Sequence, residues 1–333
     1  MHRLDLRLGL VPGLVFWMAA ASAWAQTLAD PALESMYTAG RTQELQRVSA
    51  QRVQARPDDA PAVLGLALAA LELEDEAARR HAMAAAEACM ARQPRAAACH
   101  YALGVTLGVQ AMHEGLIKAA RSAGTVREAL STAHELDPAW YPARSALIEF
   151  YLLAPGIMGG STSKAASLAA AAPRPEQVQA LQSRIAMTEQ RLEAAVQGFM
   201  KLPAGLDHAL ASDVHAWSVQ ACLGLIHEGQ WAKALPLLER SARNRADEAG
   251  AVYALGRARG EAGDHAQALK LYEQAAAAKG AAAWPVQYRL GLTLEQLGRV
   301  DDAKAAFKRH LQAGKGPKNL LDEARKRLEA LGG

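Results

Sequence analysis

The sequence predicts an all-α protein built from stacked helical hairpins. A pattern of glycine, small and apolar residues recurs every 34 to 35 residues toward the C-terminus. A fixed period of this length is typical of helical hairpins that bury their apolar faces against their neighbours. The chain is also rich in Ala and Leu and has only four Phe. No stretch shows the sustained alternation of β-branched and polar residues that would indicate strands.

The clearest copy of the pattern is VYALGRARGEAGDHAQALKLYEQA at 252–275. It predicts two helices joined at Gly263-Asp264, because glycine commonly ends a helix. Gly256 lets the second helix approach the first closely, and Ala268 and Tyr272 fill the space beside it. Equivalent residues occur 35 residues later and, more loosely, 34 residues earlier. They are Leu290, Gly291, Gly298, Ala303 and Phe307, and then Cys222, Gly229, Ala234 and Leu238.

These units resemble tetratricopeptide repeats (TPRs), which have Leu-Gly in helix A, a Gly-Asp-like turn and a small-x-x-x-aromatic pattern in helix B. The match is strong at 256–275 and 291–311, fair at 222–241 and weak upstream. The resemblance implies an α-α superhelix whose concave face is made of helix A residues. It implies binding rather than catalysis. An unrelated α-α solenoid is the alternative.

Residues 1–25 have the features of a secretory signal peptide. Two arginines precede an apolar stretch at 8–20 that is too short to cross a membrane, and Ala23 and Ala25 form a small-x-small cleavage pattern. The mature chain is therefore expected to begin near Gln26. No second stretch of about 18 apolar residues follows, so we expect no transmembrane segment in the mature chain. The periplasm is the expected compartment, with secretion as the alternative.

Residues 26–174 are expected to form the N-terminal helical repeats. A polar capping unit at 26–57 precedes a hairpin at 60–94 and a second one at 96–138. The second hairpin is ten residues longer than 252–275 predicts. We expect each of its helices to gain about five residues, which moves the turn outward by about 7 Å.

The compartment also bears on the cysteines, because an oxidising environment permits disulfides. Cys89 lies near the end of one helix and Cys99 near the start of the next, on the faces where these antiparallel neighbours meet. We therefore predict a Cys89–Cys99 disulfide, with two buried thiols as the alternative. Cys222 replaces the close-packing glycine of its repeat and is interpreted as a small core residue.

The next hairpin has the sequence PGIMGG in its turn, at 155–160. Turns between helix A and helix B project from one edge of such an array, so this turn and the extended hairpin should be neighbours. Together they would present four apolar side chains, namely Met112, Leu116, Ile157 and Met158. Exposed apolar tips mark contacts with a partner or a membrane. The alternative is that the loop and the extension bury each other.

The glycine-rich stretch at 156–164 superficially resembles a phosphate loop, although it lacks the Gly-Lys-Ser/Thr order and a preceding strand. Backbone N–H groups at Gly159, Gly160 and Ser161 could bind an anion ahead of the helix. This site underlies our alternative function, a small-molecule-binding or anion-binding protein or an enzyme. The structural alternative is a helix N-cap provided by Ser161 or Thr162.

The remaining chain divides at a candidate hinge, Pro203-Ala204-Gly205. Residues 175–212 are expected to form a degenerate helical hairpin. Residues 213–333 are expected to form three TPR-like repeats and a capping helix at 319–331.

The resemblance also implies a binding groove lined by one position of helix A. This position holds Tyr101, Tyr253 and Tyr288, and Arg257 follows Tyr253 by one helical turn. Tyrosine offers contact area and a hydroxyl at low entropic cost, so these residues could bind an extended peptide. Packing of the tyrosines in the core is the alternative.

Motifs for chemistry are lacking in the sequence. There is no HExxH, Cys-x-x-Cys or Gly-x-Ser-x-Gly motif, so we predict no catalytic residue, metal site or cofactor. The formal net charge of +3 is too small to indicate nucleic acid. The predicted function is a periplasmic protein–protein interaction scaffold that is not an enzyme and that binds a protein or peptide partner in the cell envelope.

Overall fold

The computed structural model describes residues 27–314 and 316–332; the predicted signal peptide and the start at Gln26 lie outside them. The described residues form seventeen α-helices and two short 3-10 helices. In chain order they are α1 (Pro31–Thr38), α2 (Thr42–Ala55), α3 (Ala60–Glu72), α4 (Glu76–Arg92), α5 (Ala97–His113), α6 (Leu116–Leu136), α7 (Tyr141–Leu153), η1 (Gly156–Met158), α8 (Thr162–Ala170), α9 (Pro175–Thr188), α10 (Leu192–Met200), α11 (His208–His227), α12 (Trp231–Asn244), α13 (Ala249–Glu261), α14 (His265–Ala277), η2 (Ala281–Ala283), α15 (Val286–Gln296), α16 (Val300–Ala313) and α17 (Lys318–Ala330).

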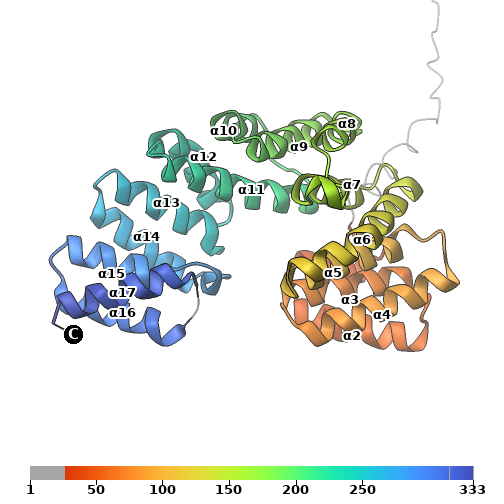
Figure 1. Cartoon of the computed structure of the whole chain (residues 1–333), viewed down its shortest axis with the longest axis horizontal. Helices are drawn as coiled ribbons and strands as arrows, with labels where there is room; N and C mark the ends of the chain where they lie inside the picture. Colours follow the sequence, from red (N-terminus) through yellow and green to blue (C-terminus); the bar gives the residue numbers. More distant parts are fainter. Residues whose placement is uncertain (1–26, 315, 333) are drawn as a thin grey trace, which may run out of the picture.

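The helices form eight antiparallel hairpins and a final cap. Odd-numbered helices from α1 to α15 are helix A of each hairpin, even-numbered helices are helix B, and α17 packs on α16. Figure 1 shows the hairpins following one another around a curved array, with α2–α6 at one end and α13–α17 at the other. One continuous apolar core extends from Leu28 to Ala324. The predicted all-α superhelix of helical hairpins is confirmed.

Close contacts between glycine and a large side chain hold the hairpins together. A Cβ on Gly256 would lie 2.8 Å from the ring of Tyr272, and one on Gly291 would lie 2.5 Å from the ring of Phe307. In the long hairpin, a Cβ on Gly104 would lie 2.7 Å from the side chain of Leu130. The sequence separation is 16 residues in the first two pairs and 26 in the third. The same contact is therefore made in the N-terminal half, with a ten-residue insertion beyond it.

That insertion is shared unequally between the two helices. α5 has 17 residues and α6 has 21, whereas α13 and α14 have 13 each. Beyond the glycine contact, α5 is four residues longer than α13 and α6 is seven residues longer than α14, and the turn is one residue shorter. The expectation of about five extra residues in each helix is corrected accordingly. The turn falls early because Gly115 has a φ of +95°, which glycine adopts without strain.

Contacts between distant hairpins show how strongly the array curves. The ring of Tyr37, in α1, lies edge-on to that of His208, at the start of α11, with centroids 5.0 Å apart. Lys279 Nζ, after α14, is 3.0 Å from Glu72 Oε1 at the end of α3. The first two hairpins therefore touch the sixth and seventh.

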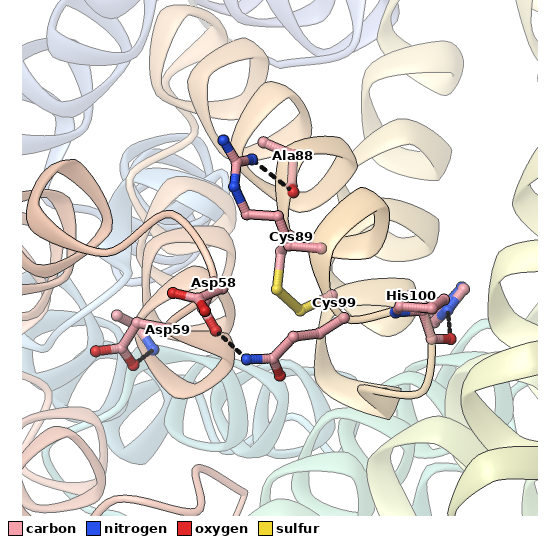
Figure 2. Close-up of a disulfide and its surroundings, with 10 residues drawn as sticks. Asp58, Asp59, Ala88, Cys89, Cys99 and His100 are labelled. Carbon is pink, nitrogen blue, oxygen red and sulfur yellow. Dashed lines mark hydrogen bonds between the residues drawn. A yellow bond between two sulfur atoms is a disulfide. The ribbon is translucent and has the colours of Figure 1, made fainter.

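The predicted disulfide joins α4 to α5 (Figure 2). Cys89 and Cys99 are both fully buried, and their Cα atoms are 5.9 Å apart. Beside the disulfide, Gln93 Nε2 donates a hydrogen bond to Asp58 O at 2.9 Å, which connects the end of α4 to the segment before α3. The disulfide thus fixes the junction between the second and third hairpins. Cys222 is buried with its thiol free, in agreement with a core role.

Removing this disulfide should lower stability. We expect the double substitution Cys89→Ala/Cys99→Ala to reduce the free energy of unfolding by about 2–3 kcal/mol, because the unfolded chain regains the freedom of the closed loop. Urea unfolding with and without reductant measures this. Reductant should shift the wild-type midpoint and leave that of the double variant unchanged. An equal response of the two proteins to reductant would contradict the prediction.

Candidate binding surfaces

The three tyrosines predicted to line a groove are core residues in the structure. Tyr101 lies edge-on to Trp140, and Tyr253 stacks on Trp284 with ring centroids 5.1 Å apart. Tyr288 packs near Phe307, and none of the three tyrosines is more than 9% exposed. Their assignment to partner binding is corrected: a tryptophan just before the next helix A covers two of the rings. The alternative that these tyrosines pack in the core is the one that the structure shows.

Arg257, the fourth groove residue, differs from the tyrosines. Its side chain is 17% exposed, and the nearest carboxylate, on Glu261, is 3.8 Å away. Arg289, on helix A of the next hairpin, lies over the ring of Tyr288. Among the described residues, the buried Nε atoms of Arg257 and Arg289 have no hydrogen-bond acceptor. Two half-buried guanidinium groups on consecutive helices A therefore retain unused donors.

The positive charges of both guanidinium groups act on one buried tyrosine. Burial raises the pKa of Tyr272, on α14 between the two helices A, and the positive charges of Arg289 and Arg257 oppose that rise. We refer to Arg257 and Arg289 together as the arginine pair. Arg289 was missed in the sequence because it falls at a different position of its helix A from that of Arg257.

A second polar cluster joins α7 to α11. Asp213 Oδ2 accepts hydrogen bonds from Tyr141 Oη at 2.7 Å and from Ser145 Oγ at 2.6 Å. Burial raises the pKa of Asp213 to about 6, although the two hydrogen bonds oppose this rise. Asp213 has no cationic partner among the described residues. Nothing in the sequence indicated this cluster, since its members lie about 70 residues apart.

The turns of the third and fourth hairpins present the most exposed large apolar side chains of the described chain. We call this set the apolar edge. Its members and their exposed fractions are Met112 (68%), Leu116 (82%), Ile117 (71%), Leu153 (61%) and Ile157 (96%). Met112, Leu116 and Ile157 are therefore exposed, as the sequence predicted, whereas Met158 is half-buried. Ile117 and Leu153 were not singled out in the sequence.

The glycine-rich turn has a structural explanation. Gly159 N, Gly160 N and Ser161 N donate to Gly156 O, Pro155 O and Tyr151 O at 2.9 to 3.1 Å. Ser161 Oγ caps α8 by accepting from Lys164 N at 3.3 Å. A Cβ on Gly160 would lie 1.7 Å from Ala154 O, so only glycine fits there. The three N–H groups on which the anion-binding prediction depended are therefore already used, as the N-cap alternative expected.

Two properties of the described residues bear on other classes of site. No cluster of three or more His, Cys, Asp or Glu side chains is arranged to hold a metal ion within residues 27–314 and 316–332. Over the same ranges, no helix combines the length and the apolar character needed to cross a membrane.

Comparison with known proteins identifies the fold. No protein-family model and no curated protein matches the chain. The crystal structure of the APC/C hetero-tetramer Cut9–Hcn1 matches with a TM-score of 0.55 and 12% identity, covering 90% of this chain. The match covers 49% of the Cut9–Hcn1 chain, so the protein spans about half of that chain's length. At this identity the likeness concerns the fold alone.

Two further solved structures are similar to the chain at lower TM-scores. PilF of Pseudomonas aeruginosa has a TM-score of 0.46 and 14% identity, covering 68% of this chain and 97% of that one. A tetratricopeptide repeat protein of Parabacteroides merdae has a TM-score of 0.45 and 13% identity, covering 80% and 98%. The repeat pattern and the hairpin architecture together define the protein as a TPR-like α-α superhelix.

Proposed function

We propose that this protein is an exported scaffold that binds a protein partner through the arginine pair. A TPR-like superhelix is a class of fold suited to protein–protein interaction. The observation that carries the proposal is the unused hydrogen-bonding capacity of Arg257 and Arg289, which are held half-buried on consecutive helices A. Leaving such donors without acceptors is unfavourable, and an incoming acceptor would relieve that cost.

The chemistry of the pair indicates the kind of group that it binds. A guanidinium group forms its strongest hydrogen bonds with carboxylates, often through two parallel N–H donors. Both side chains are half-buried, and that of Arg289 lies over the ring of the buried Tyr288, which restricts its movement before a ligand arrives. We therefore expect an extended peptide segment with an acidic side chain or a free C-terminus.

A displayed peptide library, followed by fluorescence anisotropy with the selected peptides, tests this function. We expect selected peptides to carry a carboxylate that is essential for binding. Arg257→Gln/Arg289→Gln should weaken binding at least about tenfold, since each lost charge-assisted hydrogen bond contributes about 1.5–3 kcal/mol. Arg299→Gln is the matched control, because Arg299 lies in an exposed turn paired with Asp302. Equal binding by both variants would contradict the proposal.

Export is the second part of the proposal, and the residues at 1–25 support it. We expect the processed protein to begin near Gln26 and to fractionate with the periplasm. Mass spectrometry of the purified protein and fractionation of cells test both points. An unprocessed N-terminus together with a cytoplasmic location would contradict export without affecting the peptide-binding proposal.

A further inference from the structure

The apolar edge is unlike the rest of the surface in its exposure. Its five side chains are 61–96% exposed, whereas the three other exposed large apolar side chains of the described residues, Met200, Leu297 and Val300, are 38–40% exposed. η1 packs on α6, and Gly159 lies against the side chain of Arg127. The turn between α7 and α8 therefore packs against α6 of the preceding hairpin, near Arg127.

Along α6, apolar and cationic residues follow one another in a defined order. Leu116 and Ile117 begin the helix. Lys118 follows at the next position, and Arg121 lies four residues after Ile117. At 1.5 Å per residue, Arg121 lies about 6 Å behind Ile117 along the helix axis. An apolar tip followed by cations at this spacing matches a lipid surface, where apolar side chains enter by about 5–10 Å and Lys and Arg remain at the headgroups.

The charges around the apolar edge are compatible with anionic headgroups. Arg121 and Arg127 are exposed and pair with no carboxylate among the described residues. Glu114, just before α6, is turned back along the hairpin: it accepts a hydrogen bond from Gln110 at 2.8 Å and pairs with Lys118 at 3.7 Å. The stretch 150–164 contains no acidic residue and one lysine.

The shape of the apolar edge distinguishes a lipid surface from a protein partner. Side chains as exposed as Leu116 and Ile157 stand out from the surface. The edge is aliphatic, whereas binding energy at protein interfaces is concentrated in Trp, Tyr and Arg residues packed into matched pockets. Acyl chains need no matched shape. We propose that the apolar edge inserts into the surface of an anionic lipid bilayer and anchors the array peripherally.

Vesicle co-sedimentation tests this proposal with the chain beginning at Gln26, because the apolar stretch at 8–20 would itself bind lipid. Vesicles of phosphatidylglycerol and phosphatidylethanolamine are compared with vesicles of phosphatidylcholine. We expect the wild type to bind the anionic vesicles. Leu116→Ser/Ile117→Ser/Ile157→Ser should weaken this binding at least about tenfold, since it removes three aliphatic side chains that the bilayer would bury. Melting temperatures should be unchanged, because the side chains are exposed.

Two further variants make the test specific. Leu297→Ser/Val300→Ser removes apolar side chains from the equivalent turn between α15 and α16 and should bind vesicles as the wild type does. Arg121→Gln/Arg127→Gln should weaken binding to the anionic vesicles alone. Absence of vesicle binding by the wild type, or unchanged binding by the triple-serine variant, would overturn the proposal. Specific capture of a protein by the apolar edge without vesicle binding would also overturn it. The peptide affinity of the arginine pair is measured separately and should be the same in every edge variant.

Discussion

Asp213→Asn should stabilise the protein at neutral pH and have no effect near pH 4. Asp213 Oδ2 accepts both hydrogen bonds of its cluster, from Tyr141 and Ser145, so an asparagine carbonyl in the same place can accept both. What the substitution removes is the negative charge, which burial disfavours. Burial raises the pKa of Asp213 from an ordinary 3.8 to about 6 in the folded protein.

The sign of the effect follows from proton binding. Between pH 3.8 and about 6, the folded protein holds a proton on Asp213 that the unfolded chain has released. The free energy of unfolding of the wild type therefore falls as pH rises through this window, by at most about 3 kcal/mol from this residue. The asparagine variant has no such loss. Its advantage should grow from zero near pH 4 to a plateau above pH 7.

Urea unfolding of both proteins across this pH range measures the difference. Asp207→Asn is the matched control on the same helix, because Asp207 pairs with Arg174 and caps α11 through Leu210 N. Asparagine keeps the cap and loses the ion pair, so this variant should be less stable than the wild type at neutral pH. A destabilised Asp213→Asn variant at pH 7.5 would show that the charge of Asp213 is favourable, contrary to our account.

Gly291→Leu should lower the free energy of unfolding by about 3 kcal/mol, because the C-terminal hairpins depend on a glycine opposite an aromatic ring. A Cβ at this position would lie 2.5, 2.6 and 2.8 Å from three atoms of the Phe307 ring. Phe307 is fully buried, so its ring cannot move away without displacing its neighbours. Overpacking of a filled core typically costs about 1–3 kcal/mol, and a whole leucine places this variant at the upper end.

Gly260→Ala is the control for this prediction. The nearest atoms to a Cβ on Gly260 are 3.9 and 4.0 Å away, which is ordinary contact. Alanine is the better helix former, so the variant should gain about 0.5–1 kcal/mol. Thermal and urea unfolding of both variants would show opposite shifts. Equal shifts would mean that glycine–aromatic contact does not organise the hairpins.

The sequence was sufficient for the fold because the repeat encodes it locally. Gly256 and Tyr272 are 16 residues apart in one hairpin, and the same pair recurs as Gly291 and Phe307. Cys89 and Cys99 were likewise predictable, since they lie on consecutive antiparallel helices. The ten-residue insertion after Gly104 and the apolar residues at its tip could be located by their departure from the repeat.

The candidate sites were less predictable because they depend on contacts outside the repeat. Trp140 and Trp284, just ahead of helices A, cover Tyr101 and Tyr253, and no periodic pattern gives their positions. The backbone path of the PGIMGG turn decides which N–H groups are free, and the residue types alone do not. Arg289 lies at a different position of its helix A from that of Arg257, so the repeat pattern does not group the two arginines.

We propose that a protein partner binds at the arginine pair. Photo-crosslinking in living cells tests it most directly, with a photoreactive residue at Glu261, which is exposed one turn beyond Arg257, and a control at Gln267, exposed on helix B. We predict a discrete protein adduct at Glu261, its loss in Arg257→Gln/Arg289→Gln, and none at Gln267. Adducts of equal yield at both positions, or an adduct that persists without the two arginines, would contradict the account.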